Sequence, residues 1–500
     1  MNYQELLTFL APEALTILAA LGVLFNDVSM LRGDPHPVRM RWGAWLTAFA
    51  SGVGVLAVLL TAQSTPAGYA GGMMEITPLT QLIKVVLLLL LAATALISAE
   101  FRFTDHIGEY FAILMMATVG AMFMVTAGNV LLIFISLEVL SLSLYILTAF
   151  NKTNVRSAEA ALKYFLFGGI SAAFLLFGLS LLYGLSGELE LHRMAAKLGA
   201  MKADPLLMVG ILGVFAGLGF KVAAVPFHLW APDTYQGAPL PSAAFIASAS
   251  KVASFYVLAR LMMAGLVGVE GSGGWESFER GWVPVLAVAA ALSVVAGNLA
   301  AIAQGSVRRL LAYSAVAHAG YMLIGILAAQ KAEGMASVMY YVVTYGVTAI
   351  GAFAVVGIVQ ARDGHDNLSA FAGLGKRSPI LAFCLMMFLL SMAGIPPLAG
   401  FFGKFYLFKA ALFETGPSQS NALLWLVILA IAMSAVSLYY YLQVLKQVFV
   451  VAPVEGEAEI NPEASTLWVV VLGGIVVVVL GCLPNLLVSP LVEAVRAAGF

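Results

Sequence analysis

Six ionisable residues of this 500-residue chain fall inside long apolar stretches: Lys84, Glu138, Lys163, Lys221, Lys251 and Lys404. A charged side chain at the middle of a membrane helix costs about 2.5–3.5 kcal/mol to insert. A lysine removed from water releases its proton more readily, and a nearby carboxylate opposes that release. Several lysines and one carboxylate in apolar surroundings therefore predict side chains that bind and release protons.

Glu138, in LLIFISLEVLSLSLYIL, is the carboxylate that we expect to pair with Lys221. A static structural ion pair is the alternative interpretation. A structural role alone does not explain why lysines outnumber carboxylates in these stretches. We therefore expect the pair to form and separate as a proton is bound and released.

The other lysines differ in how deeply they lie. Lys251, in AFIASASKVASFYVLA, is near the middle of its stretch, and the small residues around it leave room for water. Lys163 and Lys84 lie only a few residues inside their stretches. Each could instead extend its amine to the membrane surface, so Lys163 is a candidate for either a proton relay or a surface contact.

Two histidines also fall inside apolar stretches, His228 in VPFHLW and His318 in SAVAHAGY. Each either links helices through hydrogen bonds or carries protons. Cys384 and Cys482 stand alone, without a CxxC pattern or a neighbouring histidine cluster. The sequence therefore predicts no metal, haem or iron–sulfur cofactor in this chain.

Prolines interrupt two of the stretches, Pro226 in FKVAAVPFHLWAPD and the pair Pro396 and Pro397 in GIPPLAGFFGKFYLF. Proline removes a backbone donor and breaks a helix. The carbonyl groups left without partners need water or polar side chains. We therefore expect a hydrated break beside Lys404, where this lysine can release its proton.

The composition places the chain in a membrane. Hydrophobic residues make up 62% of it and charged residues only 10%, against about 25% charged residues in soluble domains. The 25 basic and 26 acidic residues nearly cancel, so no polybasic surface indicates a nucleic-acid partner. We predict an all-α integral membrane protein that contacts the lipid bilayer and no nucleic acid.

A membrane-spanning helix needs about 20 mostly apolar residues. The sequence predicts about fourteen such helices, at 13–31, 41–62, 75–99, 109–127, 129–150, 159–186, 205–230, 238–265, 282–304, 308–329, 335–361, 378–412, 423–450 and 465–489. Basic residues gather in the loops of one side, beginning with Arg32, Arg39 and Arg41. The positive-inside rule then places both termini on the periplasmic side of a bacterial inner membrane.

The chain also contains a weak internal repeat. The segment 127–147 aligns with 304–324, so that Gly128 falls on Gly305, 177 positions later, and Lys221 and Lys404 are 183 positions apart. A unit of five helices is odd and therefore inverts across the membrane. We predict an N-terminal three-helix segment (1–108), two inverted five-helix repeats (109–265 and 282–450), each with a proline-broken helix, and a C-terminal helix (465–500).

Three segments carry a family resemblance: FKVAAVPFHLWAPDTYQGAPLPSAAFIASASKVASF, SVRRLLAYSAVAHAGYMLIG and GIPPLAGFFGKFYLF. Together they resemble the antiporter-like membrane subunits of respiratory complex I, the proton-pumping NADH:quinone oxidoreductase. Subunit N is the most similar, because Lys404 stands where subunit M typically has a glutamate and no long lateral helix follows the fourteenth span. One departure is SVRR, since relatives often carry an acidic or amide residue in place of Ser306.

The resemblance implies a translocase subunit that moves protons through Glu138, Lys221, Lys251 and Lys404 while quinone is reduced elsewhere in the complex. FMN, iron–sulfur clusters and quinone would be bound by other subunits. The implied partners are the other membrane-arm subunits, including antiporter-like subunit M and the small subunit K.

Two other functions are alternatives to this one. A subunit of a multi-subunit sodium/proton antiporter shares the resemblance, but sodium prefers oxygen ligands, which lysines do not offer. A structural membrane spacer is the second alternative. Buried lysines argue against a spacer, because leucine at the same positions would be more stable.

Overall fold

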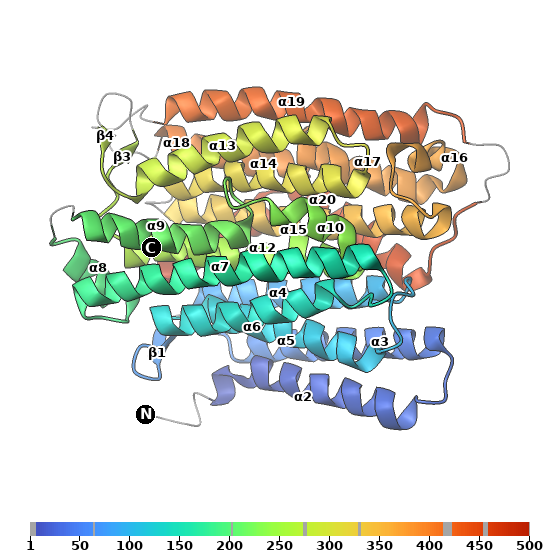
Figure 1. Cartoon of the computed structure of the whole chain (residues 1–500), viewed down its shortest axis with the longest axis horizontal. Helices are drawn as coiled ribbons and strands as arrows, with labels where there is room; N and C mark the ends of the chain where they lie inside the picture. Colours follow the sequence, from blue (N-terminus) through green and yellow to red (C-terminus); the bar gives the residue numbers. More distant parts are fainter. Residues whose placement is uncertain are drawn as a thin grey trace.

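The computed structural model describes residues 7–63, 66–201, 204–273, 278–328, 332–413, 423–453 and 459–499. Its long helices lie side by side in one bundle, with their axes along the longest dimension of the molecule (Figure 1). The only described strands form two short hairpins at one end. The predicted all-α membrane class is confirmed.

The helices of the first half are α2 (Ala11–Phe25), continued by the π-helix η1 (Asn26–Met30), α3 (His36–Leu60), α4 (Pro78–Ser98), α5 (Ile107–Thr126), α6 (Val130–Thr148), α7 (Val155–Ser186), α8 (Leu191–Leu198), α9 (Pro205–Val222), α10 (Trp230–Gly237), α11 (Leu240–Ala247), α12 (Ala249–Arg260) and the π-helix η2 (Leu261–Gly265). The hairpins pair β1 (Ala67–Tyr69) with β2 (Met74–Ile76) and β3 (Ser272–Gly273) with β4 (Phe278–Glu279).

The helices of the second half are α13 (Trp282–Ile302), α14 (Val307–Leu327), α15 (Ala332–Asp363), the 3₁₀-helix η3 (Leu368–Phe371), α16 (Leu374–Arg377), α17 (Pro379–Ala393), α18 (Ala399–Phe413), α19 (Leu424–Phe449), α20 (Ala464–Cys482) and α21 (Asn485–Ala497). Within the described residues, thirteen helical segments are long and apolar enough to cross a membrane. Because α17 and α18 together form one more crossing, the prediction of about fourteen is confirmed.

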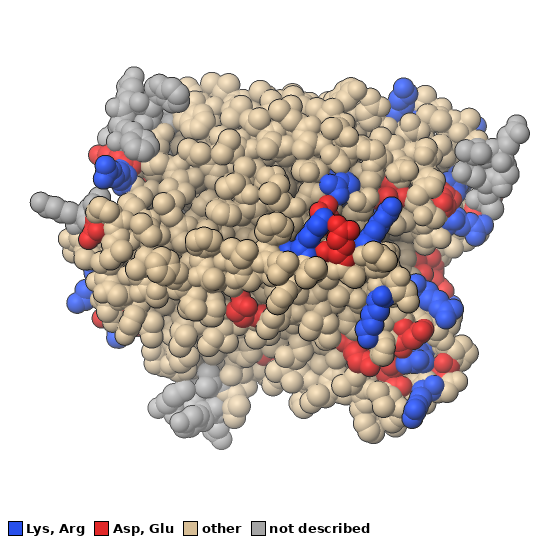
Figure 2. All heavy atoms as spheres, viewed as in Figure 1, with Lys and Arg blue, Asp and Glu red and all other residues tan. Residues whose placement is uncertain are grey.

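The bundle has two different ends. Figure 1 shows α8 and the hairpins at its left, which we call the α8 end, and α16 at its right, which we call the α16 end. In Figure 2 most of the visible Lys, Arg, Asp and Glu atoms lie toward the α16 end, and the rest of this face is largely uncharged. A broad uncharged surface of this kind suits contact with lipid.

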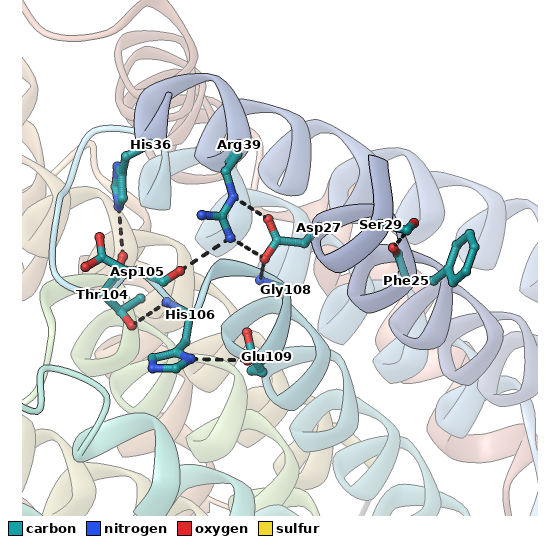
Figure 3. A network of polar contacts seen from close by, with 10 residues as sticks. All are labelled: Phe25, Asp27, Ser29, His36, Arg39, Thr104, Asp105, His106, Gly108 and Glu109. Carbon is teal, nitrogen blue, oxygen red and sulfur yellow. Dashed lines mark hydrogen bonds and ion pairs between the residues drawn. The ribbon is translucent and has the colours of Figure 1, made fainter. Parts of the chain in front are cut away.

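A polar network joins the first helices at the α16 end (Figure 3). Arg39 at the start of α3 donates two hydrogen bonds, of 2.8 and 2.7 Å, to the carboxylate of Asp27 in η1. The backbone N–H of Gly108 in α5 donates a third, of 2.9 Å, to the same carboxylate. One side chain, that of Asp27, therefore links η1, α3 and α5.

Two helices are interrupted in the middle of the bundle. In the first interruption, α9 ends at Val222, Ala223 has a left-handed backbone (φ 60°), and α10 begins at Trp230. In the second, α17 ends at Ala393 before Gly394 (φ 89°). The spans 205–230 and 378–412, which were predicted to be broken by proline, are each divided, with Pro226 in the first gap and Pro396 and Pro397 in the second.

The two interruptions are 171 positions apart, since Ala223 and Gly394 both end a helix in the left-handed region. This spacing differs from the 183 positions that separate Lys221 from Lys404. By contrast, the isolated β-bridges Asn129 to Glu190 and Ser306 to Asn367 are related by 177 positions, the spacing expected from the sequence alignment.

The sequence did not predict several smaller features. The predicted span 238–265 is interrupted at Ser248, whose backbone (φ −117°, ψ −87°) separates α11 from α12 without a proline. The predicted last span 465–489 ends earlier, at Cys482, and a separate helix, α21, follows. The short helix α8 and the β3–β4 hairpin lie between predicted spans, and β2 overlaps the start of the predicted span 75–99.

Candidate functional site

Lys404 lies against the end of the broken helix α17. Its Nζ donates hydrogen bonds of 3.0 Å to the carbonyls of both Met392 and Ala393, and one of 2.8 Å to Ser434 Oγ on α19. The side chain is only 5% exposed. Carbonyl groups at a helix C-terminus lack intrahelical partners and carry partial negative charge, so they stabilise a cation. In this structure Lys404 itself binds these two carbonyls.

Lys251 lies three residues after the interruption at Ser248. Its Nζ donates a 2.7 Å hydrogen bond to the carbonyl of Ala315 on α14 and lies 5.5 Å from the ring centre of Tyr345. The side chain is 1% exposed. The structure therefore places this lysine inside the bundle, between the first and second halves of the chain, and no carboxylate of the described residues forms an ion pair with it.

Lys221 is in the last turn of α9, directly before the first interruption. Its Nζ donates a 2.8 Å hydrogen bond to Ser141 Oγ on α6 and lies 5.7 Å from the ring centre of Tyr164. Glu138 is one turn before Ser141 on the same helix. Its buried Oε1 has no hydrogen-bond partner among the described residues. Lys221 therefore contacts Ser141, one turn after Glu138 on α6, rather than Glu138 itself.

Lys163 is not buried. It is 40% exposed and forms ion pairs with Glu159 at 2.6 Å and with Asp233 at 2.8 Å. Arg309, at the start of α14, contacts the other oxygen of Asp233 at 2.7 Å. This group joins α7, α10 and α14, and Figure 2 shows acidic and basic atoms grouped on the face over α7 and α10. The structure thus places Lys163 in a surface cluster, apart from the buried lysines.

The two histidines occupy different surroundings. His228 lies within the first interruption, beside Leu229, which is 62% exposed, and its Nδ1 has no partner among the described residues. His318 on α14 is 2% exposed and contacts the hydroxyls of Tyr341 and Tyr441. Of the two histidines, only His318 takes part in polar contacts near the central lysines within the part of the chain that the structure describes.

Lys84 is also buried, and it has a partner that the sequence did not indicate. Its Nζ lies 2.6 Å from Oε1 of Glu13 on α2. Glu13 and Lys84 are 71 positions apart, so no local pattern relates them. Ser141, by contrast, could have been found, because residues three apart on a helix share one face.

Comparison with known proteins gives the family. The family described as "NADH:quinone oxidoreductase/Mrp antiporter, TM" matches residues 127–436. NADH-quinone oxidoreductase subunit N 2 of Acidobacterium capsulatum is 50% identical over 496 residues, covering 97% of this chain and 98% of the relative. Subunit N of Desulforamulus reducens is 40% identical over 416 residues, covering 82% of this chain and 83% of the relative.

Solved structures agree with this result. A chain of respiratory complex I from Thermus thermophilus has a TM-score of 0.78 at 31% identity, covering 97% of this chain and all of that one. A chain of the Mrp complex from Dietzia has a TM-score of 0.79 at 20% identity, covering 97% of each chain, and so shows a shared fold. The chain therefore belongs to the antiporter-like membrane subunits of the NADH:quinone oxidoreductase/Mrp antiporter family, in the subunit N group.

Proposed function

We propose that this chain is a proton-translocating membrane-arm subunit of a complex I type NADH:quinone oxidoreductase. Relatives that cover nearly the whole chain carry the name of that enzyme's subunit N. In this proposal the chain has no redox centre of its own, and FMN, iron–sulfur clusters and quinone are bound by other subunits. Quinone reduction there drives changes in charge and hydration along this chain.

The contact of Lys404 with the end of α17 is the observation that carries the proposal. Two carbonyl groups and one hydroxyl surround the ammonium, and no carboxylate of the described residues forms an ion pair with it. Helix-end dipoles favour the protonated lysine by a modest amount, typically about 0.3–2 kcal/mol, whereas burial opposes it. A small change in hydration or in a neighbouring charge can then move the proton on or off the amine.

The proposed proton-transfer residues are Glu138, Lys221, Lys251 and Lys404, with Lys163, His228 and His318 as further candidates. Lys163, in its exposed cluster with Asp233, suits exchange with the α16 end rather than transfer inside the bundle. Pro226, Pro396 and Pro397 belong to the interruptions that leave helix-end carbonyls available to cations.

The orientation and neighbours are part of the same proposal. Basic residues are abundant at the α16 end, which the positive-inside rule places in the cytoplasm of a bacterial cell. The α8 end, where α2 begins, then faces the periplasm, so both termini lie on that side. Subunits M and K are the proposed neighbours in the membrane arm. The segments 109–265 and 282–450 are the proposed inverted repeats.

Substitution of Lys404 in the assembled complex tests this function. Lys404→Ala should assemble but lose most NADH:quinone turnover and proton pumping. Lys404→Arg should also fail, because a guanidinium stays protonated. Lys409→Ala is the matched control, since Lys409 lies on the same helix but is exposed. Pumping by Lys404→Arg at the wild-type rate would contradict the proposal.

The sodium/proton antiporter alternative predicts a different dependence. Proton movement by membrane vesicles would then require sodium and would continue without NADH oxidation. Vesicles prepared in sodium-free buffer distinguish the two functions, because the proposed oxidoreductase subunit pumps there at its full rate and only while NADH is oxidised.

A further inference from the structure

The imidazole of His318 is bound at both nitrogens by tyrosine hydroxyls. Nδ1 lies 2.7 Å from the hydroxyl of Tyr341 on α15, and Nε2 lies 3.1 Å from that of Tyr441 on α19. All three side chains are at most 2% exposed. A neutral imidazole has one N–H and one lone pair, so one hydroxyl donates to it and the other accepts from it.

The contacts continue beyond Tyr441. Its hydroxyl is hydrogen-bonded to Ser314 Oγ, one turn before His318 on α14. Tyr341, His318, Tyr441 and Ser314 therefore form a continuous hydrogen-bonded chain of four groups. Each hydroxyl and the imidazole can both donate and accept, which is the property that proton conduction along hydrogen bonds requires.

This four-group chain lies between Lys251 of the first half and Lys404 of the second half. Ser314 precedes Ala315, whose carbonyl accepts from Lys251. At the other end, His318 and Tyr341 line a small cavity together with Tyr345 and Met392. Tyr345 faces Lys251, and the carbonyl of Met392 accepts from Lys404. The cavity has room for about one water molecule.

We infer that Tyr341 and Tyr441 are proton-relay residues, which carry protons through His318 between the surroundings of Lys251 and those of Lys404. The inference deepens the proposed function and rests on it. It assigns to two tyrosine hydroxyls the transfer step between Lys251 and Lys404, because these lysines share no hydrogen-bond partner among the described residues.

The transfer conserves protons and leaves none of the four groups charged. The ammonium of Lys404 gives a proton to the cavity water, which passes one of its protons to the oxygen of Tyr341, whose own hydroxyl proton moves to Nδ1 of His318. The proton on Nε2 moves to the oxygen of Tyr441, whose hydroxyl proton moves to Ser314, and the neutral amine of Lys251 takes up the hydroxyl proton of Ser314. Lys404 is left neutral and Lys251 becomes protonated. Rotation of the hydroxyls and exchange of the imidazole proton between the two nitrogens restore the starting state of the four groups.

Tyr440 provides a matched control in the same helix. Its hydroxyl donates a 3.0 Å hydrogen bond to Oδ1 of Asn298, and Nδ2 of Asn298 lies 3.1 Å from the hydroxyl of Tyr321. Tyr440 is as deeply buried as Tyr441, at 2% exposure. An amide side chain does not take up and release protons near neutral pH, so this second set of contacts is structural.

The test uses Tyr341→Phe, Tyr441→Phe, the double variant and Tyr440→Phe in the assembled complex. Proton pumping and NADH:quinone turnover are measured in membrane vesicles, and the thermal midpoint of the complex is measured in detergent. Each relay variant should lower pumping by about tenfold or more, and the double variant should lose no more than the worse single one, because the groups act in series. Tyr440→Phe removes a hydroxyl that is not part of the relay, so this variant should pump within about twofold of wild type.

Other results overturn the inference. Near-normal pumping by either relay variant excludes that hydroxyl from the path, and additive losses accompanied by a lowered thermal midpoint show a structural clamp. Lys404→Ala, assayed in parallel, separates the two proposals. If it fails while both tyrosine variants pump normally, only the relay is wrong; if it pumps normally, the proposed function itself is wrong.

Discussion

Lys84 and Glu13 form a buried ion pair between α4 and α2, with 2.6 Å between Nζ and Oε1. Both residues are at most 2% exposed. The pair lies near the α8 end, because each residue is close to the start of a helix that begins there. The sequence left Lys84 free to reach the membrane surface, and that alternative is wrong because the lysine instead faces a carboxylate from another helix.

Removal of one partner should destabilise the N-terminal helices strongly. Glu13→Gln leaves the Lys84 charge buried and uncompensated, which typically costs about 3–5 kcal/mol. The double variant Glu13→Leu with Lys84→Met should recover most of this loss, since two apolar groups replace the pair. The thermal midpoint of the purified complex measures both effects. If the double variant is no more stable than Glu13→Gln, the pair is not the source of the stability.

Glu138 should act on Lys221 through its charge. Glu138→Gln keeps the shape and removes the charge, so proton pumping and turnover should fall about tenfold or more, equivalent to roughly 1.4 kcal/mol. Glu138→Asp retains the charge on a shorter side chain and should keep a substantial part of the activity. The measurement is NADH:quinone turnover normalised to assembled complex. Equal activity of the two variants would rule out the electrostatic role.

Ser141 should matter less than Glu138. Ser141→Ala removes the hydroxyl that accepts from Lys221 but leaves the nearby carboxylate. We expect a loss of only about twofold to fivefold, because one neutral hydrogen bond contributes about 0.5–1.5 kcal/mol. A loss as large as that of Glu138→Gln would show instead that the hydroxyl is an obligatory part of the path.

Gly394 should be intolerant of a side chain. Its backbone is left-handed (φ 89°), where a Cβ costs about 1–2 kcal/mol. That Cβ would also lie 3.1 Å from Cδ and 3.4 Å from Nζ of Lys404, and so would push the amine away from its carbonyl partners. Gly394→Ala should therefore reduce pumping severalfold. Ala223→Gly is the matched control at the other interruption and should pump normally; equal losses in both would indicate a general effect on folding.

A cluster at the α8 end should respond to pH. His192 on α8 lies 3.8 Å from Glu75 on β2, and Arg260 also pairs with Glu75. The hydrogen-bonding carboxylate of Glu75 raises the pKa of His192 above its ordinary value of 6.5, although partial burial and Arg260 oppose this. Protonated His192 therefore stabilises the folded protein fully below about pH 6.5. This contribution to stability is lost as the pH rises through the raised pKa of His192.

His192→Gln tests this dependence. The thermal midpoints of wild type and variant are compared from about pH 5.5 to about pH 8.5, the range in which histidine titrates. The wild type should be the more stable at the acid end, and the two curves should merge at the alkaline end. A constant difference over the whole range would show that the histidine acts through packing rather than charge.

Much of the fold follows from local sequence patterns. Apolar length predicts the spans, and proline predicts the gaps before α10 and α18, because both signals act on the backbone of their own segment. The interruption at Ser248 has no such signal. Its segment, ASAS, is compatible with a continuous helix, so the break depends on the packing of α11 and α12 against other helices.

The site is less predictable than the fold. Lys221, Lys251 and Lys404 can be found because a lysine in an apolar stretch is conspicuous, but their contacts come from distant segments. Lys163 pairs with Asp233, seventy positions away, and the partners of His318 come from α15 and α19. Contacts of this kind are decided by tertiary structure, and a single sequence does not encode them in any local pattern.

The two helix interruptions are 171 positions apart, and at this spacing the buried lysines of the two halves do not fall at matching positions. At that spacing Lys221 corresponds to Met392, and Lys404 corresponds to Asp233. Identical inverted units would place a matching lysine in opposite leaflets, yet α9 and α18 both lie toward the α8 end (Figure 1). In the proposed inverted repeats, the basic group therefore lies before the interruption in the first unit and after it in the second. A chimera made of two copies of either proposed unit would be symmetric across the bilayer and would lose this difference between its two halves.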